Sequence, residues 1–144
     1  MVSNQNSDFV LDASAALAWC FKDEASGAAW SLLDRMKQGA KAYVPNLWWL
    51  EVANVLLMAQ RRNRISQTNL NILFDFLSTL RIETDNERGM KVAHDSILLA
   101  REESLSAYDA TYLVLAKKKS LPLATKDRAL LKAAKNISVD LIEV

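Results

Sequence analysis

The sequence is poor in the residues on which several common kinds of active site depend. Its 144 residues include one cysteine, Cys20, and one histidine, His94. A single cysteine cannot form an internal disulfide, and this pair cannot supply a thiolate cluster or a two-histidine zinc site. Only three glycines occur, too far apart for a dinucleotide fingerprint or a phosphate-binding loop. If the protein is an enzyme, we expect carboxylates to be its main chemical groups.

A strong net charge is also missing. Lys and Arg number 18 against 17 Asp and Glu, which gives a formal net charge of +1, so any site for a polyanion must be local. The first basic residue is Lys22, and Asp12 interrupts the apolar stretch 9–21, which falls short of the roughly 20 residues of a membrane span. We therefore expect a cytoplasmic protein with no membrane partner.

The apolar pattern alternates between strand and helix along the whole chain. Short strands are predicted at 9–11, 42–45, 81–84, 121–125 and 139–142, and helices at 13–21, 26–37, 47–62, 70–80, 87–103, 107–118 and 128–134. This alternation is typical of a mostly parallel sheet with helices on both faces, which binds ligands at the carboxyl ends of its strands. With 51% hydrophobic residues and no linker or repeat, residues 1–144 are expected to form a single domain.

Two aspartates follow predicted strands. Asp12 ends the first strand and Asp127 comes shortly after the fourth, so both are expected at the same edge of a parallel sheet. Aspartate at such a turn is also a common N-cap of the following helix, and that interpretation is open for each residue alone. Ser14 and Thr125 lie two residues from these acids, where they can support a ligating carboxylate or serve as ordinary turn and cap hydroxyls.

Two further acids fall on largely apolar helix faces. Glu51 has Trp48 and Val55 among its neighbours at helical spacing, and Asp109 has Tyr112. A basic partner at the rim would explain Glu51, and the dipole of its helix would explain Asp109. If all four acids converge, they raise one another's pKa, and a hard divalent cation such as Mg²⁺ or Mn²⁺ is the natural compensation. The chemistry expected of such a site is phosphoryl transfer by metal-activated water.

The segments that carry these acids resemble the signature segments of the PIN-domain family. They are FVLDAS at 9–14, LEVAN at 50–54, SAYDA at 106–110 and LATKD at 123–127. The VapC-like toxins of toxin–antitoxin pairs are the most similar members. The resemblance spans nearly the whole chain in the family's order. It implies a PIN-like three-layer α/β sandwich around a five-stranded, mostly parallel sheet with helices on both faces.

The same resemblance implies a function. It suggests a metal-dependent endoribonuclease, the toxin of a type II toxin–antitoxin system, which cleaves RNA phosphodiester bonds with metal-activated water. The implied cofactor is Mg²⁺ or Mn²⁺, and the implied partners are the RNA substrate, a cognate antitoxin and a second copy in a homodimer. The catalytic residues that the resemblance implies are the metal-binding acids Asp12, Glu51, Asp109 and Asp127 and the assisting hydroxyls of Ser14 and Thr125.

Two other functions fit part of the pattern. A catalytically weak binding protein with this fold would use the acids to capture a basic partner peptide or RNA. A phosphoacceptor signalling module on a flavodoxin-like sheet also gathers acids and Mg²⁺ at strand ends. In that module, however, Asp8 would lie at the wrong end of the first strand, and Glu51 and Asp109 would have no role.

The remaining basic and aromatic residues have ordinary structural explanations. The basic runs at 61–64 and 117–119 are expected to be solvated helix ends, where positive charge favours the dipole. Most of the four tryptophans are expected in the core. Trp48 and Trp49 are adjacent on a predicted helix, so one of them is expected to lie outside the main core.

Overall fold

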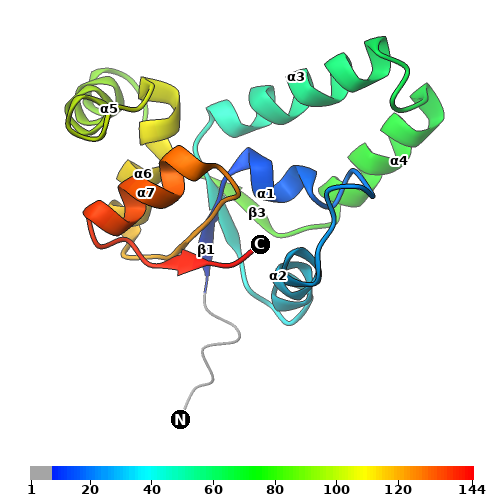
Figure 1. Cartoon of the computed structure of the whole chain (residues 1–144), viewed down its shortest axis with the longest axis horizontal. Helices are drawn as coiled ribbons and strands as arrows, with labels where there is room; N and C mark the ends of the chain where they lie inside the picture. The colour runs from blue at the N-terminus through cyan, green and yellow to red at the C-terminus, as the bar shows by residue number, and fades with distance from the viewer. Residues whose placement is uncertain (1–7) are drawn as a thin grey trace.

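A parallel sheet organises the chain, and the computed structural model describes residues 8–144 of it (Figure 1). Its strands are β1 (Phe9–Leu11), β2 (Ala42–Val44), β3 (Ile82–Thr84), β4 (Leu123–Ala124) and β5 (Leu141–Ile142). Its helices are α1 (Ala13–Leu17), α2 (Gly27–Lys37), α3 (Leu47–Arg61), α4 (Gln67–Ser78), α5 (Met90–Glu103), α6 (Ala107–Lys119) and α7 (Arg128–Asn136). The predicted alternation of strands and helices is confirmed.

The order of the strands creates a topological switch point at the centre of the sheet. The five strands lie in the order β3-β2-β1-β4-β5, and every neighbouring pair is parallel. From β1 the chain first builds the sheet toward β3 and then returns to the other side of β1 with β4. In open α/β sheets, ligands bind at such a switch point, outside the carboxyl ends of the strands. The order differs from that of a flavodoxin-like sheet, so the phosphoacceptor alternative is wrong.

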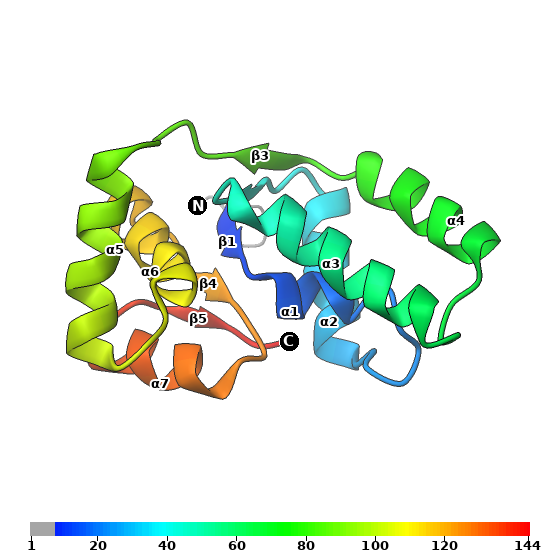
Figure 2. The same ribbon diagram turned by 90° about the horizontal axis from the view of Figure 1, so that it is seen from above.

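The helices cover the sheet in two groups. Helices α5, α6 and α7 gather on one side of the molecule and α1 to α4 on the other (Figure 2). Helix α6 packs against β1 and β4, and α5 packs along α6. Helices α3 and α4 form a hairpin that extends away from the sheet. In residues 8–144, no helix combines the length and the apolar character needed to cross a membrane.

The core lies around the central strand. All three residues of β1 are fully buried, because helices cover both of its faces. Trp48 is fully buried, whereas its neighbour Trp49 is half-exposed, which confirms that one of the two lies outside the core. Trp19 is buried but Trp30 is half-exposed, so the expectation that most tryptophans are core holds for only two of the four.

Several predicted boundaries were wrong for identifiable local reasons. Helix α5 begins at Met90 instead of residue 87, because Gly89 has a φ of +77° that cannot continue a helix backward. Helix α4 begins at Gln67 instead of residue 70, because the Ser66 hydroxyl accepts a hydrogen bond from the Asn69 amide and caps it. Helix α1 ends at Leu17, where a turn replaces the helix predicted to residue 21.

Candidate active site

The site begins where β1 and β4 end side by side. The Asp12 amide donates a hydrogen bond of 3.0 Å to the Ala124 carbonyl, which continues the pairing of the two strands. Asp12 and Thr125 are therefore neighbours at the carboxyl edge of the sheet, although 113 positions separate them in the sequence. Both are buried, with 4% and 2% of their surface exposed. The predicted placement of Asp12 at the switch point of the sheet is thus what the structure shows.

Two hydroxyl groups fix the Asp12 carboxylate. Its Oδ2 accepts hydrogen bonds from Ser14 Oγ at 2.6 Å and from Thr125 Oγ1 at 2.7 Å. The Lys126 amide donates to Ser14 Oγ, and the Asp127 amide donates to Thr125 Oγ1. Because each hydroxyl carries one hydrogen and already accepts from the backbone, that hydrogen is directed at Asp12. Asp12 makes no capping bond to α1, so the N-cap interpretation does not hold for it.

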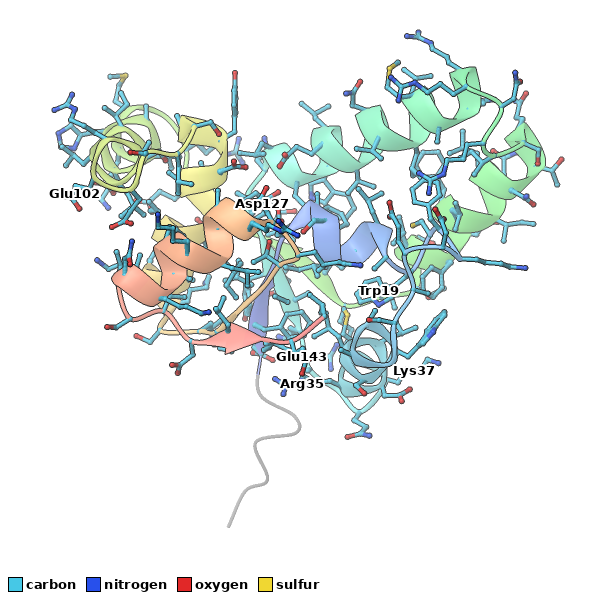
Figure 3. All side chains as sticks on the ribbon, in the orientation of Figure 1. Trp19, Arg35, Lys37, Glu102, Asp127 and Glu143 are labelled. Atoms are coloured by element: carbon cyan, nitrogen blue, oxygen red, sulfur yellow. The ribbon has the colours of Figure 1, made fainter. Side chains whose placement is uncertain are left out.

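Asp127 caps helix α7 and is also a candidate ligand of the site. Its Oδ1 accepts a hydrogen bond of 3.0 Å from the Leu130 amide, so the capping interpretation is confirmed for this residue. That bond uses Oδ1 and leaves Oδ2 available, and the residue is partly exposed. Figure 3 shows Asp127 at the start of α7, and the bond from Lys126 to Ser14 ties this turn to the start of α1. Asp127 therefore faces the same crevice as Asp12.

Glu51 is held by a tyrosine that the sequence analysis did not single out. The hydroxyl of Tyr112 on α6 donates a short hydrogen bond to Glu51 Oε1 on α3, and Tyr112 is fully buried. Burial raises the pKa of Tyr112, so the phenol is a neutral donor in the physiological range. Tyr112 lies three residues after Asp109, one turn further along α6. The sequence signal that could have identified Tyr112 is its position on the same helix face as the candidate acid Asp109.

The pKa values of three acids are raised mainly by burial. Loss of contact with water raises the pKa of Asp12, while the hydrogen bonds from Ser14 and Thr125 oppose this rise. Burial also raises the pKa of Glu51, and the hydrogen bond from Tyr112 opposes it. No described Lys or Arg forms an ion pair with Glu51, so the expected explanation by a basic partner at the rim is wrong.

The negative charges of the acids also act on one another. Burial is the largest cause of the raised pKa of Asp12, and the charge of Asp127 raises this pKa further. The charges of Asp12 and Asp109 likewise add to the effect of burial on the pKa of Glu51. Burial raises the pKa of Asp109 first, and then the charges of Asp127 and Asp12 do so. Such coupling requires the charges to be close together. Ser14 and Thr125 contact Asp12 directly, whereas Glu51, Asp109 and Asp127 are linked to Asp12 through the effects of their charges. That the four acids converge on one site stays a prediction.

The donor set fits a hard divalent cation. In residues 8–144, no three side chains of the Asp, Glu, His and Cys types stand close enough to hold a metal ion directly. Mg²⁺ keeps several of its waters and binds proteins through one or two carboxylates, so a looser group of oxygen donors is suitable for it. The mutual repulsion of the acids is the feature that such an ion would relieve.

The basic runs lie in structural ion pairs. Lys118 binds Asp85 and Glu87 at the start of the segment before α5, and Lys119 lies over the ring of Tyr43. Arg64 makes two hydrogen bonds of 2.8 Å to the carboxylate of an aspartate in the loop after α1 and stacks on a phenylalanine. The runs lie at or just after the ends of α3 and α6, as predicted, but these three side chains make specific contacts and are not simply solvated.

Comparison with known proteins places the chain in a family. The PIN domain matches residues 9–136, which is most of the sequence. No curated protein sequence matches the chain significantly. The solved structures that resemble this chain have low sequence identity to it, so the likeness shows the fold alone.

Three solved structures illustrate this likeness. A protein from Pyrobaculum aerophilum has 24% identity and a TM-score of 0.66, with 95% of this chain and 85% of that chain covered. A toxin–antitoxin complex from Klebsiella pneumoniae contains a chain with 20% identity and a TM-score of 0.54, at 83% and 87% coverage. VapBC2 from Rickettsia felis, bound to a DNA fragment from its promoter, contains one with 15% identity and a TM-score of 0.65, at 94% and 97% coverage.

Proposed function

This chain belongs to the PIN-domain family, and from that premise we propose that it is an Mg²⁺- or Mn²⁺-dependent endoribonuclease and the toxin of a type II toxin–antitoxin system. The family as a whole consists of nucleases, which makes a phosphodiester the natural substrate. The proposal treats residues 1–144 as one PIN-like domain. Its finer parts, which are the metal, the RNA and the toxin role, rest on the site and on the structural neighbours.

The observation that carries this proposal is the electrostatic coupling of four acids without a basic partner. Asp12 is buried and fixed by two hydroxyls, and the charge of Asp127 raises its pKa further. Glu51 and Asp109 approach from α3 and α6, on either side of the sheet edge. Folding tolerates such repulsion when an outside cation compensates it.

The residues of the chain have distinct roles in this proposal. One or two of the carboxylates of Asp12, Glu51, Asp109 and Asp127 would hold the cation directly, and the others would hold it through its waters. The cation when bound supplies an activated water and stabilises charge on the phosphodiester. Ser14 and Thr125 keep the Asp12 carboxylate in one orientation. Tyr112 keeps Glu51 turned toward the crevice and is a positioning residue. Burial of these groups limits competing water and strengthens their action on the substrate.

The proposed partners follow from the neighbours of similar fold. Two of them are chains of toxin–antitoxin assemblies, which supports an antitoxin that blocks the crevice here. We also propose a homodimer that acts in the cytoplasm. Light scattering on the purified chain measures the mass of the assembly. Co-expression with the product of the adjacent gene tests the antitoxin, which is expected to co-purify and to abolish cleavage.

The direct test is RNA cleavage in defined metal. The purified full chain is incubated with total cellular RNA in EDTA, in Mg²⁺ and in Mn²⁺. We expect cleavage only with the divalent ions, and a loss of more than about 100-fold in Asp12→Asn, beyond the usual effect of a residue that only supports a ligand. Asp140→Asn is the matched control, because Asp140 is exposed and precedes β5 at the opposite edge. A metal-replete protein that binds RNA or a basic peptide but cleaves no RNA would favour the binding-protein alternative instead.

A further inference from the structure

A second cavity lies beside the acidic crevice. It has a volume of about 460 Å³, within the roughly 300–1,000 Å³ of pockets that bury small ligands. It is bounded by the start of α3, the segment between β3 and α5, and the facing sides of α5 and α6. Its wall is mostly apolar and includes Leu47, Leu50, Ala93, Tyr108 and Val114. The cavity therefore suits a flat ligand of moderate size.

The cavity is joined to the crevice through two helices. Leu50 lines the cavity and precedes Glu51 on α3, and Tyr108 lines it and precedes Asp109 on α6. The first residues after β2 and β3 complete the wall, so the cavity opens at the same carboxyl edge of the sheet. A phosphodiester at the acids would thus place a neighbouring nucleoside at the mouth of the cavity.

A buried hydroxyl in the wall has no partner. Ser96 on α5 lines the cavity, is 2% exposed, and its Oγ makes no hydrogen bond. Buried polar groups in folded proteins nearly always have a partner, and an unpaired one lowers stability. Because Ser96 Oγ has less than 1 Å² of accessible surface, it would meet a ligand only after the side chain turns toward the cavity. A ligand with a hydrogen-bonding edge would then satisfy this hydroxyl.

The mouth of the cavity carries an exposed aromatic ring and an exposed apolar side chain. The Tyr108 ring is 69% exposed and the Leu50 side chain 74%. Bases of single-stranded RNA stack on exposed aromatic rings of this kind. Asp85 and Glu87 at the rim are paired with Lys118, at 3.2 and 2.8 Å, so their charges are compensated.

We propose that this cavity binds a nucleobase of the RNA substrate, adjacent to the phosphodiester held at the acids. The base stacks against Tyr108 and turns its polar edge to Ser96 Oγ, while the apolar wall encloses its faces. Arg88, which lines the rim and is exposed, contacts the neighbouring phosphate. This subsite rests on the proposed ribonuclease function and would give that function its base preference.

The test uses the full chain carrying Asp12→Asn, which keeps RNA intact. Amide NMR spectra are recorded with each of the four nucleoside 5′-monophosphates, and fluorescence anisotropy with single-stranded RNA homopolymers of ten nucleotides. We expect shifts at Val92, Ala93 and Ser96, and one base that binds better than the others. Tyr108→Ala is expected to weaken RNA binding on the order of tenfold. Trp30→Ala, which removes another exposed aromatic ring, on α2, is expected to change nothing.

Ser96→Ala separates a ligand contact from a structural role. The hydroxyl it removes has no partner in the protein, so we expect an unchanged or higher Tm together with a loss of the base preference. A lower Tm with an unchanged base preference would overturn the assignment of Ser96. Shifts confined to other surfaces with all four monophosphates would overturn the subsite itself.

The remaining outcomes distinguish this inference from the proposed function. Normal metal-dependent cleavage with RNA binding unaffected by Tyr108→Ala would refute the base site and leave the ribonuclease standing. If Tyr108→Ala instead dissociates a dimer or releases the antitoxin without altering RNA binding, the face is a protein interface and the base site is refuted. Monophosphate shifts at Ser96 in a protein that cleaves no RNA would retain the base site and refute the nuclease.

Discussion

Two acidic clusters in this protein have opposite electrostatic character. In the crevice, burial and neighbouring negative charge raise the pKa of Asp12, Glu51 and Asp109. At the start of α5, hydrogen bonds from Lys118 and Lys91 lower the pKa of Glu87. The second cluster is solvated and paired with lysines, whereas the acids of the first are oriented by neutral hydroxyls and a phenol.

The difference separates a cluster with a structural explanation from one that lacks a compensating charge within residues 8–144. Where lysines compensate the carboxylates, the chain has already supplied the opposite charge, and the contact contributes modestly to stability at an exposed site. Where only neutral donors are present, the carboxylates are oriented but not compensated. Perturbed acids gathered in a crevice are typical of active sites. A cation from outside the chain is the compensation that we propose for these acids.

The largest effect within this comparison is expected from Tyr112→Phe. The change removes the hydroxyl that donates to Glu51 and leaves the ring in the core. Because supports of metal ligands typically contribute about 10–100-fold, we expect RNA cleavage and Mn²⁺ affinity to fall by that factor. Calorimetric titration with Mn²⁺ and cleavage assays measure both quantities. Tyr43→Phe makes the same chemical change on β2, away from the crevice, and should leave both unchanged.

Opposite shifts in Tm are expected from neutralising one acid in each cluster. Without metal, Asp109→Asn should raise the Tm by about 1–3 °C, because it removes one of four mutually repelling charges. Glu87→Gln should not raise it, because that charge is paired with Lys91 and Lys118. Calorimetric melting in EDTA measures both. A fall in the Tm of Asp109→Asn under these conditions would show that the four acids are not strained in the metal-free protein.

The smallest effect is a dependence of metal-free stability on pH. An acid whose pKa is raised by folding binds more protons in the folded state than in the unfolded state, so its contribution to stability decreases as the pH rises. For the crevice this decrease begins near the ordinary values of 3.8 for Asp and 4.5 for Glu and continues up through the raised values. Glu87 has the opposite sign, with stability lost only as the pH falls below its ordinary 4.5.

Denaturant unfolding between pH 4.5 and 7 in EDTA measures this slope. We expect the contribution of the crevice acids to the free energy of unfolding to decrease as the pH rises over this range. The free energy of unfolding should decrease less steeply with pH in Asp109→Asn than in the wild type. Saturating Mg²⁺ should remove most of the decline, because the cation favours the ionised carboxylates. Identical slopes in the wild type and in Asp109→Asn would mean that Asp109 is not coupled to the crevice.

The elements of the fold were predictable because their patterns are local. The run from Ala107 to Lys118 shows helical periodicity, and the structure extends the helix by one residue. The error at residues 87–89 arose because Gly89 has a φ of +77°, which ends the helix on its N-terminal side. Sequence periodicity does not record the φ that a glycine adopts in the folded chain.

The site was predictable in its acids but not in their surroundings. Asp12 and Asp127 have the same sequence context of strand followed by helix, yet only Asp127 caps its helix. The difference arises because Thr125, directly after the neighbouring strand β4, donates to Asp12. Tyr112 was missed for a similar reason, because its partner lies 61 positions away. Which hydroxyl meets which carboxylate depends on strand order, and that is a property of the folded chain.

Paramagnetic broadening by Mn²⁺ tests the convergence of the four acids most directly. Amide NMR spectra of the full chain are recorded while Mn²⁺ is added at substoichiometric amounts. The first signals to broaden should be those around Asp12, Glu51, Asp109 and Asp127, with Asp12→Asn abolishing the effect. Broadening that begins at Asp85 and Glu87, or that spreads evenly over the surface acids, would contradict a shared cation site in the crevice.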